Sequence, residues 1–361
     1  MKDLLGRNID YMRISITDRC NLRCRYCMPY GVERVPRWDI LTLEEIEAIA
    51  ICGAGLGIRH IKVTGGEPLV RKDCCQLVKR LKATPGIDKV TITTNGVLLD
   101  RYLDDLAEAG IDGINISLDT LDRELYREIT GRDALGEVLS VLERAAKLPI
   151  PVKINGVSID FSAIPGPGGE NREKPDGCGK DRKVWQQLAE LAREYPIDVR
   201  FIEMMPIGYG KNFKTLNHEM LLDEMREVYP SLEQDDRIHG FGPAVYYRIP
   251  GFKGSIGLIS AIHGKFCSDC NRVRLTSQGY LKPCLCYEEG ADLRRILRGD
   301  QERPGEEGHY RWPLAVSPSD EALQRKLREV MERTIAAKPA AHCFECPGQI
   351  TEAHNMIAIG G

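Results

Sequence analysis

Hydrophobic and polar positions alternate in two distinct ways along residues 11–205. Short segments such as residues 12–17 and 61–66 are rich in β-branched residues and alternate apolar with polar side chains, which is typical of strands. Longer segments such as residues 42–56 place apolar residues at helical spacing. The repeated order predicts about six βα units. Their strands are expected at residues 12–17, 61–66, 89–96, 113–120, 151–157 and 197–206.

Sequential parallel strands joined by helices form a closed barrel or an open, doubly wound sheet, and both place functional groups at the carboxyl ends of the strands. The glycine-rich segment 64–68 and the polar segments 93–96 and 117–120 each lie at the carboxyl end of a predicted strand. We therefore expect an α/β fold, a partial (β/α)6 TIM-type barrel, with its functional site at this end. Thr42 and Glu45 have the spacing of a capping box, which predicts a helix start there.

After about residue 215 the regular alternation gives way to mixed helices and short strands. This change predicts a barrel domain over residues 1–215 and a smaller region over residues 216–361 that closes the barrel and ends in a Gly-Gly tail. Segments 162–183 and 299–313 are rich in glycine, proline and charge, and they are interpreted as exposed insertions.

Composition narrows the possible functions. The 361-residue chain has a formal net charge of -3 and no run of five like charges, so no nucleic-acid or membrane binding is expected. Residues 1–12 lack the apolar stretch of a signal peptide, and no segment approaches the ~18 apolar residues of a membrane span, so we expect a cytoplasmic protein. In a reducing compartment, thirteen cysteines favour metal or redox chemistry over a disulfide framework.

A first group of cysteines, Cys20, Cys24 and Cys27, has the spacing C-x3-C-x2-C directly after a predicted strand. Three thiolates are one fewer than an ordinary iron-sulfur cluster uses, so one iron is left open for another ligand. Zinc is the alternative, but this spacing is uncommon for zinc and no well-placed fourth ligand follows. The pattern therefore predicts an iron-sulfur cluster with an open coordination site.

A second group, Cys267, Cys270 and Cys284, is again a set of three. On spacing alone zinc and an iron-sulfur cluster are equally compatible, because Cys286 or His263 could supply a fourth zinc ligand. These two groups are called the first trio and the second trio below.

Arginines beside the second trio favour an iron-sulfur cluster that lies next to a phosphate-binding site. Arg272 and Arg274 are two residues apart, so they lie on one side of a strand next to the cysteines. The planar guanidinium group donates paired hydrogen bonds to phosphate, although surface salt bridges are its commoner role. Lys153 and Arg200 lie within apolar strand patterns, where an unpaired charge would be costly and an anionic ligand would explain it.

Several motifs together resemble one family. TDRCNLRCRYCMP, VTGGEP, TTNG, SLDT, VKIN, RFIEMMP, GSIGLIS, CNRVRLTSQGYLKPC and the terminal Gly360-Gly361 are similar to the GTP 3',8-cyclases of molybdenum cofactor biosynthesis, the MoaA family of the radical S-adenosylmethionine (SAM) superfamily. The resemblance runs from about residue 5 to residue 361, interrupted by the two insertions. It implies the partial barrel as the fold.

The resemblance also implies the cofactors and their residues. Two 4Fe-4S clusters would be held by Cys20, Cys24 and Cys27 and by Cys267, Cys270 and Cys284. SAM would be contacted by Tyr26, Gly66, Ser117 and Met205, and GTP by Arg13, Lys62, Thr93, Lys153, Arg200, Arg272 and Arg274. Lys62 stands where the family usually has arginine, and an ammonium is not equivalent to a bidentate fork.

The implied reaction needs no catalytic side chain. SAM is cleaved to methionine and a 5'-deoxyadenosyl radical, which takes the hydrogen from C3' of GTP and leads to (8S)-3',8-cyclo-7,8-dihydroguanosine 5'-triphosphate. This is the first step of molybdopterin synthesis. The implied partners are a flavodoxin- or ferredoxin-like electron donor and, downstream, cyclic pyranopterin monophosphate synthase, with the enzyme a monomer or homodimer.

Two other functions stay open on the sequence. A radical SAM peptide-modifying enzyme with an auxiliary cluster would share the first trio and the barrel, and a non-catalytic electron carrier could hold two clusters. Cys343 and Cys346 form a further C-x2-C pair with no assigned role. Ordinary free thiols are expected at Cys52, Cys74, Cys75 and Cys178.

Overall fold

The computed structural model of the chain describes residues 1–31, 35–160, 180–299 and 317–359. Most of both predicted insertions lies outside these residues, as do Cys178 and the Gly360-Gly361 tail.

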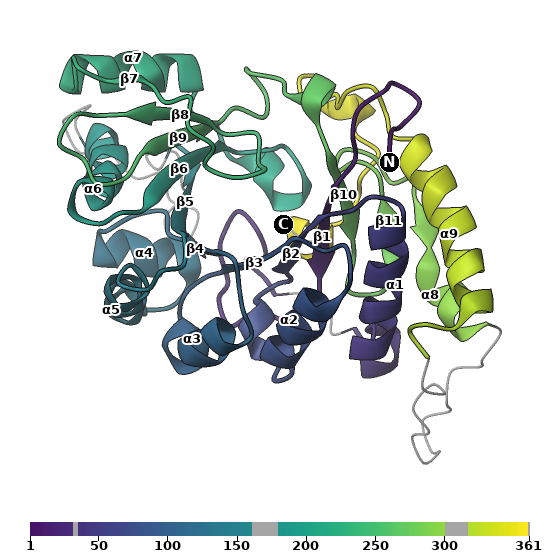
Figure 1. The fold of residues 1–361 in the computed structure, drawn as a ribbon. Helices are drawn as coiled ribbons and strands as arrows, with labels where there is room; N and C mark the ends of the chain where they lie inside the picture. The colour runs from purple at the N-terminus through teal and green to yellow at the C-terminus, as the bar shows by residue number, and fades with distance from the viewer. Residues whose placement is uncertain (32–34, 161–179, 300–316, 360–361) are drawn as a thin grey trace.

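One curved sheet organises the chain (Figure 1). Six parallel strands lie side by side in chain order, as the alternation of strands and helices predicted. They are β1 (Tyr11–Ser15), β2 (His60–Thr64), β3 (Lys89–Thr94), β4 (Ile114–Ser117), β5 (Val152–Ser158) and β6 (Asp198–Glu203). These strands and their connecting helices form a partial (β/α)6 TIM-type barrel, so the predicted fold is confirmed.

Strands from the second region extend both edges of this sheet. β10 (Arg272–Leu275) pairs with β1 and β9 (Ile256–Ile259) pairs with β6, both in parallel. Antiparallel strands follow at each edge: β11 (Tyr280–Lys282), β12 (Ala291–Asp292), β8 (Val245–Arg248) and β7 (Glu233–Gln234). The β10–β1 pairing brings the arginine strand of the second region against the strand that leads into the first trio.

Helices cover the outer face of the barrel (Figure 1). They are α1 (Leu43–Gly55), α2 (Cys74–Ala83), α3 (Leu99–Glu108), α4 (Arg123–Thr130), α5 (Leu135–Ala145) and α6 (Lys180–Glu194), followed by α7 (His218–Val228), α8 (Leu293–Arg298) and α9 (Glu321–Ala336). None of the helices in the described part of the chain combines the length and apolar composition that a transmembrane helix requires.

The predicted capping box at the start of α1 is present. The backbone N–H of Glu45 donates to the Thr42 hydroxyl at 3.2 Å, and the Glu45 carboxylate accepts from the Thr42 N–H at 2.8 Å. The same carboxylate binds Arg298 of α8 at 2.6 Å. One buried acid therefore caps the first helix and fixes a helix of the second region against it; a cap of this kind is worth about 1 kcal/mol.

The two faces of each barrel strand have different roles. In β1, Met12 and Ile14 are fully buried in the hydrophobic core, whereas Arg13 lines an interior cavity. This alternation follows from the period of two in a strand. The barrel strands therefore bury apolar side chains beneath the helices and present polar ones to the interior.

Candidate functional site

A cavity of about 340 Å³ opens at the carboxyl ends of the barrel strands. Thr64, Thr94, Ser117 and Glu203 line it, and each is the last residue of its strand. Both trios line the same cavity: Cys20, Cys24, Cys27, Cys267, Cys270 and Cys284. Two cysteine groups far apart in the sequence therefore face one space.

The first trio lies in a largely desolvated loop. Burial raises the pKa of all three thiols, that of Cys27 to about 12. The backbone N–H of Leu22 donates to the sulfur of Cys20 at 3.5 Å, and the Asn95 amide lies 3.8 Å from it. Three free thiols that converge on one cavity are a donor set that fits a metal cluster, which would displace their protons on binding.

Gly65 and Gly66 pack directly on the loop that leads to the first trio. A Cβ atom on Gly66 would lie 2.4 Å from the carbonyl oxygen of Arg19 and 2.9 Å from Ile357. The N–H of Gly66 donates to Thr17, and that of Glu67 donates to Arg19, both at 2.8 Å. The glycines are therefore required by backbone packing, in addition to the ligand approach expected from the sequence.

Replacing Gly66 with alanine is expected to destabilise the chain by about 1–3 kcal/mol, because the added methyl group overpacks the loop. Denaturant unfolding would measure the change. Gly136→Ala in α5 is the matched control, because a Cβ atom there would have no described atom within 4 Å and alanine favours helices, so unchanged or increased stability is expected. Equal stability of Gly66→Ala and the wild type would contradict the packing argument.

Glu67 joins the glycine loop to the end of β3. Its carboxylate is fully buried and accepts from the Thr94 hydroxyl at 2.7 Å, the Asn95 N–H at 2.7 Å and the Leu69 N–H at 3.1 Å. Burial raises the pKa of Glu67 to about 7 despite these hydrogen bonds. Next to this loop, Thr64 lines the cavity, and its buried hydroxyl has no hydrogen-bond partner in the described residues.

The four residues predicted to contact SAM, Tyr26, Gly66, Ser117 and Met205, all line the cavity. The Tyr26 hydroxyl donates to the Asp119 carboxylate at 2.8 Å, and Asp119 also accepts from the Val157 N–H at 2.8 Å. Asp119 therefore ties the cysteine loop to the ends of β4 and β5. Its role was not predicted, although it lies within the SLDT segment.

Cations gather inside the barrel next to the cavity. Arg274, Arg13 and Lys62 are register partners in β10, β1 and β2, so their positive charges form one row across three strands. Burial lowers the pKa of Arg13 to about 10 and also lowers that of Arg274. Arg13, Thr93, Arg272 and Arg274 line the cavity, as expected for a phosphate site.

Lys62 is the third member of this row, but unlike Arg13 and Arg274 it is not among the residues that line the cavity. Its pKa is well below the ordinary value because of burial first, and then because of Arg200, Arg13, Lys153 and Arg272. The Lys62 ammonium forms no hydrogen bond or ion pair with any residue that the structure describes. Such a group gains most from an anionic ligand.

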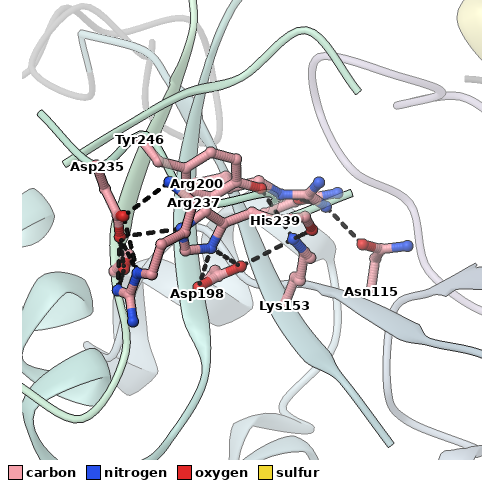
Figure 2. A network of polar contacts seen from close by, with 10 residues as sticks. Asn115, Lys153, Asp198, Arg200, Asp235, Arg237, His239 and Tyr246 are labelled. Carbon is pink, nitrogen blue, oxygen red and sulfur yellow. Dashed lines mark hydrogen bonds and ion pairs between the residues drawn. The ribbon is translucent and has the colours of Figure 1, made fainter. Parts of the chain in front are cut away.

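Lys153 and Arg200 lie away from the cavity lining, in a polar network shown in Figure 2. The Lys153 ammonium donates to Asp198 at 2.8 Å, to the Tyr246 hydroxyl at 3.0 Å and to the carbonyl oxygen of His239. Partners within the protein therefore offset the charge of Lys153, which weakens the sequence argument that its burial requires an anionic ligand. Its assignment to GTP stays a prediction.

Arg200 also has protein partners. Its guanidinium donates to the side-chain oxygen of Asn115 at 2.5 Å (Figure 2) and to that of Asn155 at 2.6 Å. These neutral amides accept its hydrogen bonds, and no carboxylate in the described part of the chain pairs with its charge, so Arg200 still adds to the positive potential inside the barrel.

Two basic residues lower the pKa of one thiol in the second trio. Burial alone would raise the pKa of Cys270, but Arg272 and Lys338 outweigh it and lower the pKa to about 7. The backbone N–H of His342 donates to the sulfur of Cys267 at 3.5 Å. In the His342 ring, Nε2 is buried without a partner in the described residues, and His342 lines the cavity.

The proposed fourth zinc ligands are engaged elsewhere. His263 Nδ1 lies 2.7 Å from the buried Glu203 carboxylate. The sulfur of Cys286 lies 3.3 Å from that of Cys343. Within the described ranges, no three histidine, cysteine or acidic side chains are placed to hold a single metal ion. A zinc site is therefore not preformed there.

Two known protein families match this chain. Residues 14–178 match the radical SAM superfamily, and residues 197–344 match the family described as Molybdenum Cofactor Synthesis C. The GTP 3',8-cyclase of Alkaliphilus metalliredigens is 43% identical over 366 residues, and that of Clostridium perfringens strain 13 is 39% identical over 363 residues; each alignment covers 100% of both chains.

Among solved structures, SuiB of Streptococcus suis bound to S-adenosylmethionine aligns with a TM-score of 0.59 and 14% identity, covering 98% of this chain and 77% of that one. At this identity the similarity establishes the fold alone. The full-length identity to the cyclases is far higher, and it shows that this chain belongs to the GTP 3',8-cyclase family.

Proposed function

We propose that the chain converts GTP to (8S)-3',8-cyclo-7,8-dihydroguanosine 5'-triphosphate at the expense of SAM, the first step of molybdenum cofactor biosynthesis. The observation that carries this proposal is that two three-cysteine groups and a pair of arginines line one cavity. Its relatives of 38–43% identity are GTP 3',8-cyclases along their full length, which supports the same activity here.

The first trio would hold a 4Fe-4S cluster. When bound, this cluster supplies the electron that cleaves SAM and offers an iron to which SAM binds. The chain's own contribution is placement. The Thr64 hydroxyl and the glycine loop would contact the amino acid end of SAM, and the Tyr26–Asp119 hydrogen bond would fix another part of the cavity lining.

The second trio would hold another 4Fe-4S cluster, whose open iron binds the guanine end of GTP. Arg13, Arg272 and Arg274, with Lys62 beside them, would hold the triphosphate. Fixing both ends of GTP keeps C3' of the ribose close to the site of SAM cleavage, and such positioning is a large part of catalysis. In this proposal residues 1–215 carry the SAM site and residues 216–361 carry the second cluster.

The electron donor would be a small flavodoxin- or ferredoxin-like protein, and the product would pass to cyclic pyranopterin monophosphate synthase. Both partners follow from the family.

An anaerobic assay tests the proposed function. Reconstituted protein with SAM, GTP and dithionite is expected to form cyclised nucleotide and 5'-deoxyadenosine, and absence of cyclised nucleotide would refute the proposal.

GTP is also expected to raise the melting temperature of the protein, because it binds only the folded chain. A peptide-modifying enzyme would show no such protection. Two clusters correspond to about eight irons per chain, one cluster to about four.

A further inference from the structure

Lys338 lies beside the second trio although no sequence motif singled it out. It follows α9, is only 6% exposed and lines the cavity. Its ammonium donates to the carbonyl oxygen of Arg272 at 2.8 Å and to that of Pro283 at 2.5 Å. Pro283 precedes Cys284, and Arg272 comes two residues after Cys270. One buried side chain therefore joins the two backbone segments that present these cysteines.

Arg7 is a second buried cation near the second trio, and its surroundings can be compared with those of Lys338. The guanidinium of Arg7 donates to the carbonyl oxygens of Cys267, Lys338, Pro339 and Ala340 at 2.7–3.1 Å. Its charge is offset by the Asp3 carboxylate at 2.6 Å. Arg7 thus fixes the backbone around the second trio without adding net charge.

Lys338 differs from Arg7 in this respect. Within the residues that the structure describes, its ammonium is paired with no carboxylate; it donates to the two carbonyl oxygens and also forms a side-chain hydrogen bond with Cys270. A buried charge without a counter-ion is costly. The negative charge next to it would be that of the second trio's thiolates and of the metal cluster that they hold.

We propose that Lys338 is a positioning residue for the second cluster, fixing the segments of Cys270 and Cys284 and stabilising the cluster's reduced state with its charge. This inference rests on the proposed function, because it requires a cluster at the second trio. One-electron reduction adds a negative charge to a cluster, and a nearby ammonium favours the more negative form. Lys338 therefore makes the reduction potential of this cluster more positive.

The test is a redox titration of anaerobically reconstituted protein, following the EPR signals of both clusters. Lys338→Met removes the charge and Lys338→Arg keeps it, while Lys326→Met removes a charge from an exposed position on α9. We expect Lys338→Met to shift the potential of the second cluster to more negative values and to leave the first unchanged. Lys338→Arg is expected to keep the potential of the second cluster close to the wild-type value. Lys326→Met is expected to cause no shift.

Iron content distinguishes the possible failures. About eight irons in Lys338→Met with an unshifted second potential would overturn the role of Lys338 and leave the proposed function intact. Loss of about four irons from Lys338→Met but not from Lys338→Arg would support the inference, because the charge is then needed to retain the cluster. Loss from both variants would overturn it in favour of a packing role. About four irons in the wild type would refute the second cluster itself.

Discussion

Replacing Cys24 with serine is expected to abolish both SAM cleavage and the formation of cyclised nucleotide. The first trio offers three thiolates, so the loss of one leaves two, too few to hold a cluster with a single open iron. The barrier reduction that the bound cofactor provides is then lost, and activity is expected to fall by at least about three orders of magnitude. Detection of 5'-deoxyadenosine and of cyclised GTP in the anaerobic assay measures both losses.

Iron content and a matched variant show whether this effect is specific. Cys24→Ser is expected to retain about four irons, those of the second cluster. Cys75→Ser removes a thiol in α2 that is only partly buried and lies outside the cavity lining, so full iron content and activity are expected. If Cys24→Ser kept all its iron and cleaved SAM at the wild-type rate, the first trio would not be the cluster site.

The barrel could be predicted because each strand carries a local signal. Six segments alternate apolar and polar residues with helical segments between them, and all six became parallel strands in chain order. The sequence pattern did not identify α4 and α5 between β4 and β5. It also could not show that β9 and β10 continue the barrel sheet, because the pairing of distant short strands depends on the whole fold rather than on local periodicity.

The site was predictable where spacing within a short segment carries the information. Both trios and the Arg272–Arg274 pair are of this kind, and the structure places all of them around one cavity. Asp119 and Lys338 were missed because a single acid after a strand or a single lysine after a helix has many possible roles. Their partners are distant in sequence and are brought near only by the fold.

At Lys153 the sequence suggested a ligand, whereas the fold supplies a partner from the protein itself. Its position in an apolar strand correctly indicated burial, but the sequence did not show that Asp198 lies beside it. Lys153 and Asp198 are register partners in β5 and β6, 45 residues apart in the chain. The cost of a buried charge therefore indicates a ligand only after partners within the fold have been considered.

Lys62 is a stronger candidate by this criterion, and Lys62→Met is expected to stabilise the ligand-free protein while weakening GTP binding. Without an anion, the half-buried ammonium next to Arg13 and Arg200 destabilises the fold, and methionine fills the same space without charge. With GTP present, the lost charge-assisted contact is expected to cost about 1.5–3 kcal/mol, which is roughly 10–150-fold in Kd. Thermal unfolding with and without GTP would show both effects.

The pH dependence of fold stability and of GTP affinity provides a second, independent test of Lys62. Because the pKa of Lys62 is below 10.5 in the folded chain, the unfolded chain binds more protons between the lowered pKa and 10.5. Lys62 therefore destabilises the ligand-free fold below its folded pKa, and this penalty is relieved as the pH rises through that window. GTP favours the charged lysine, so wild-type affinity is expected to fall over the same window, more steeply than in Lys62→Met.

Two further variants separate charge from packing at this position. Lys62→Arg restores a cation and is expected to bind GTP at least as tightly as the wild type, because the guanidinium can hold phosphate through paired hydrogen bonds. Lys79→Met removes a charge from the exposed face of α2 and is expected to change neither stability nor GTP affinity. If Lys62→Met destabilised the ligand-free protein and left GTP affinity unchanged, the row of Arg274, Arg13 and Lys62 would be a structural feature of the barrel rather than a phosphate site.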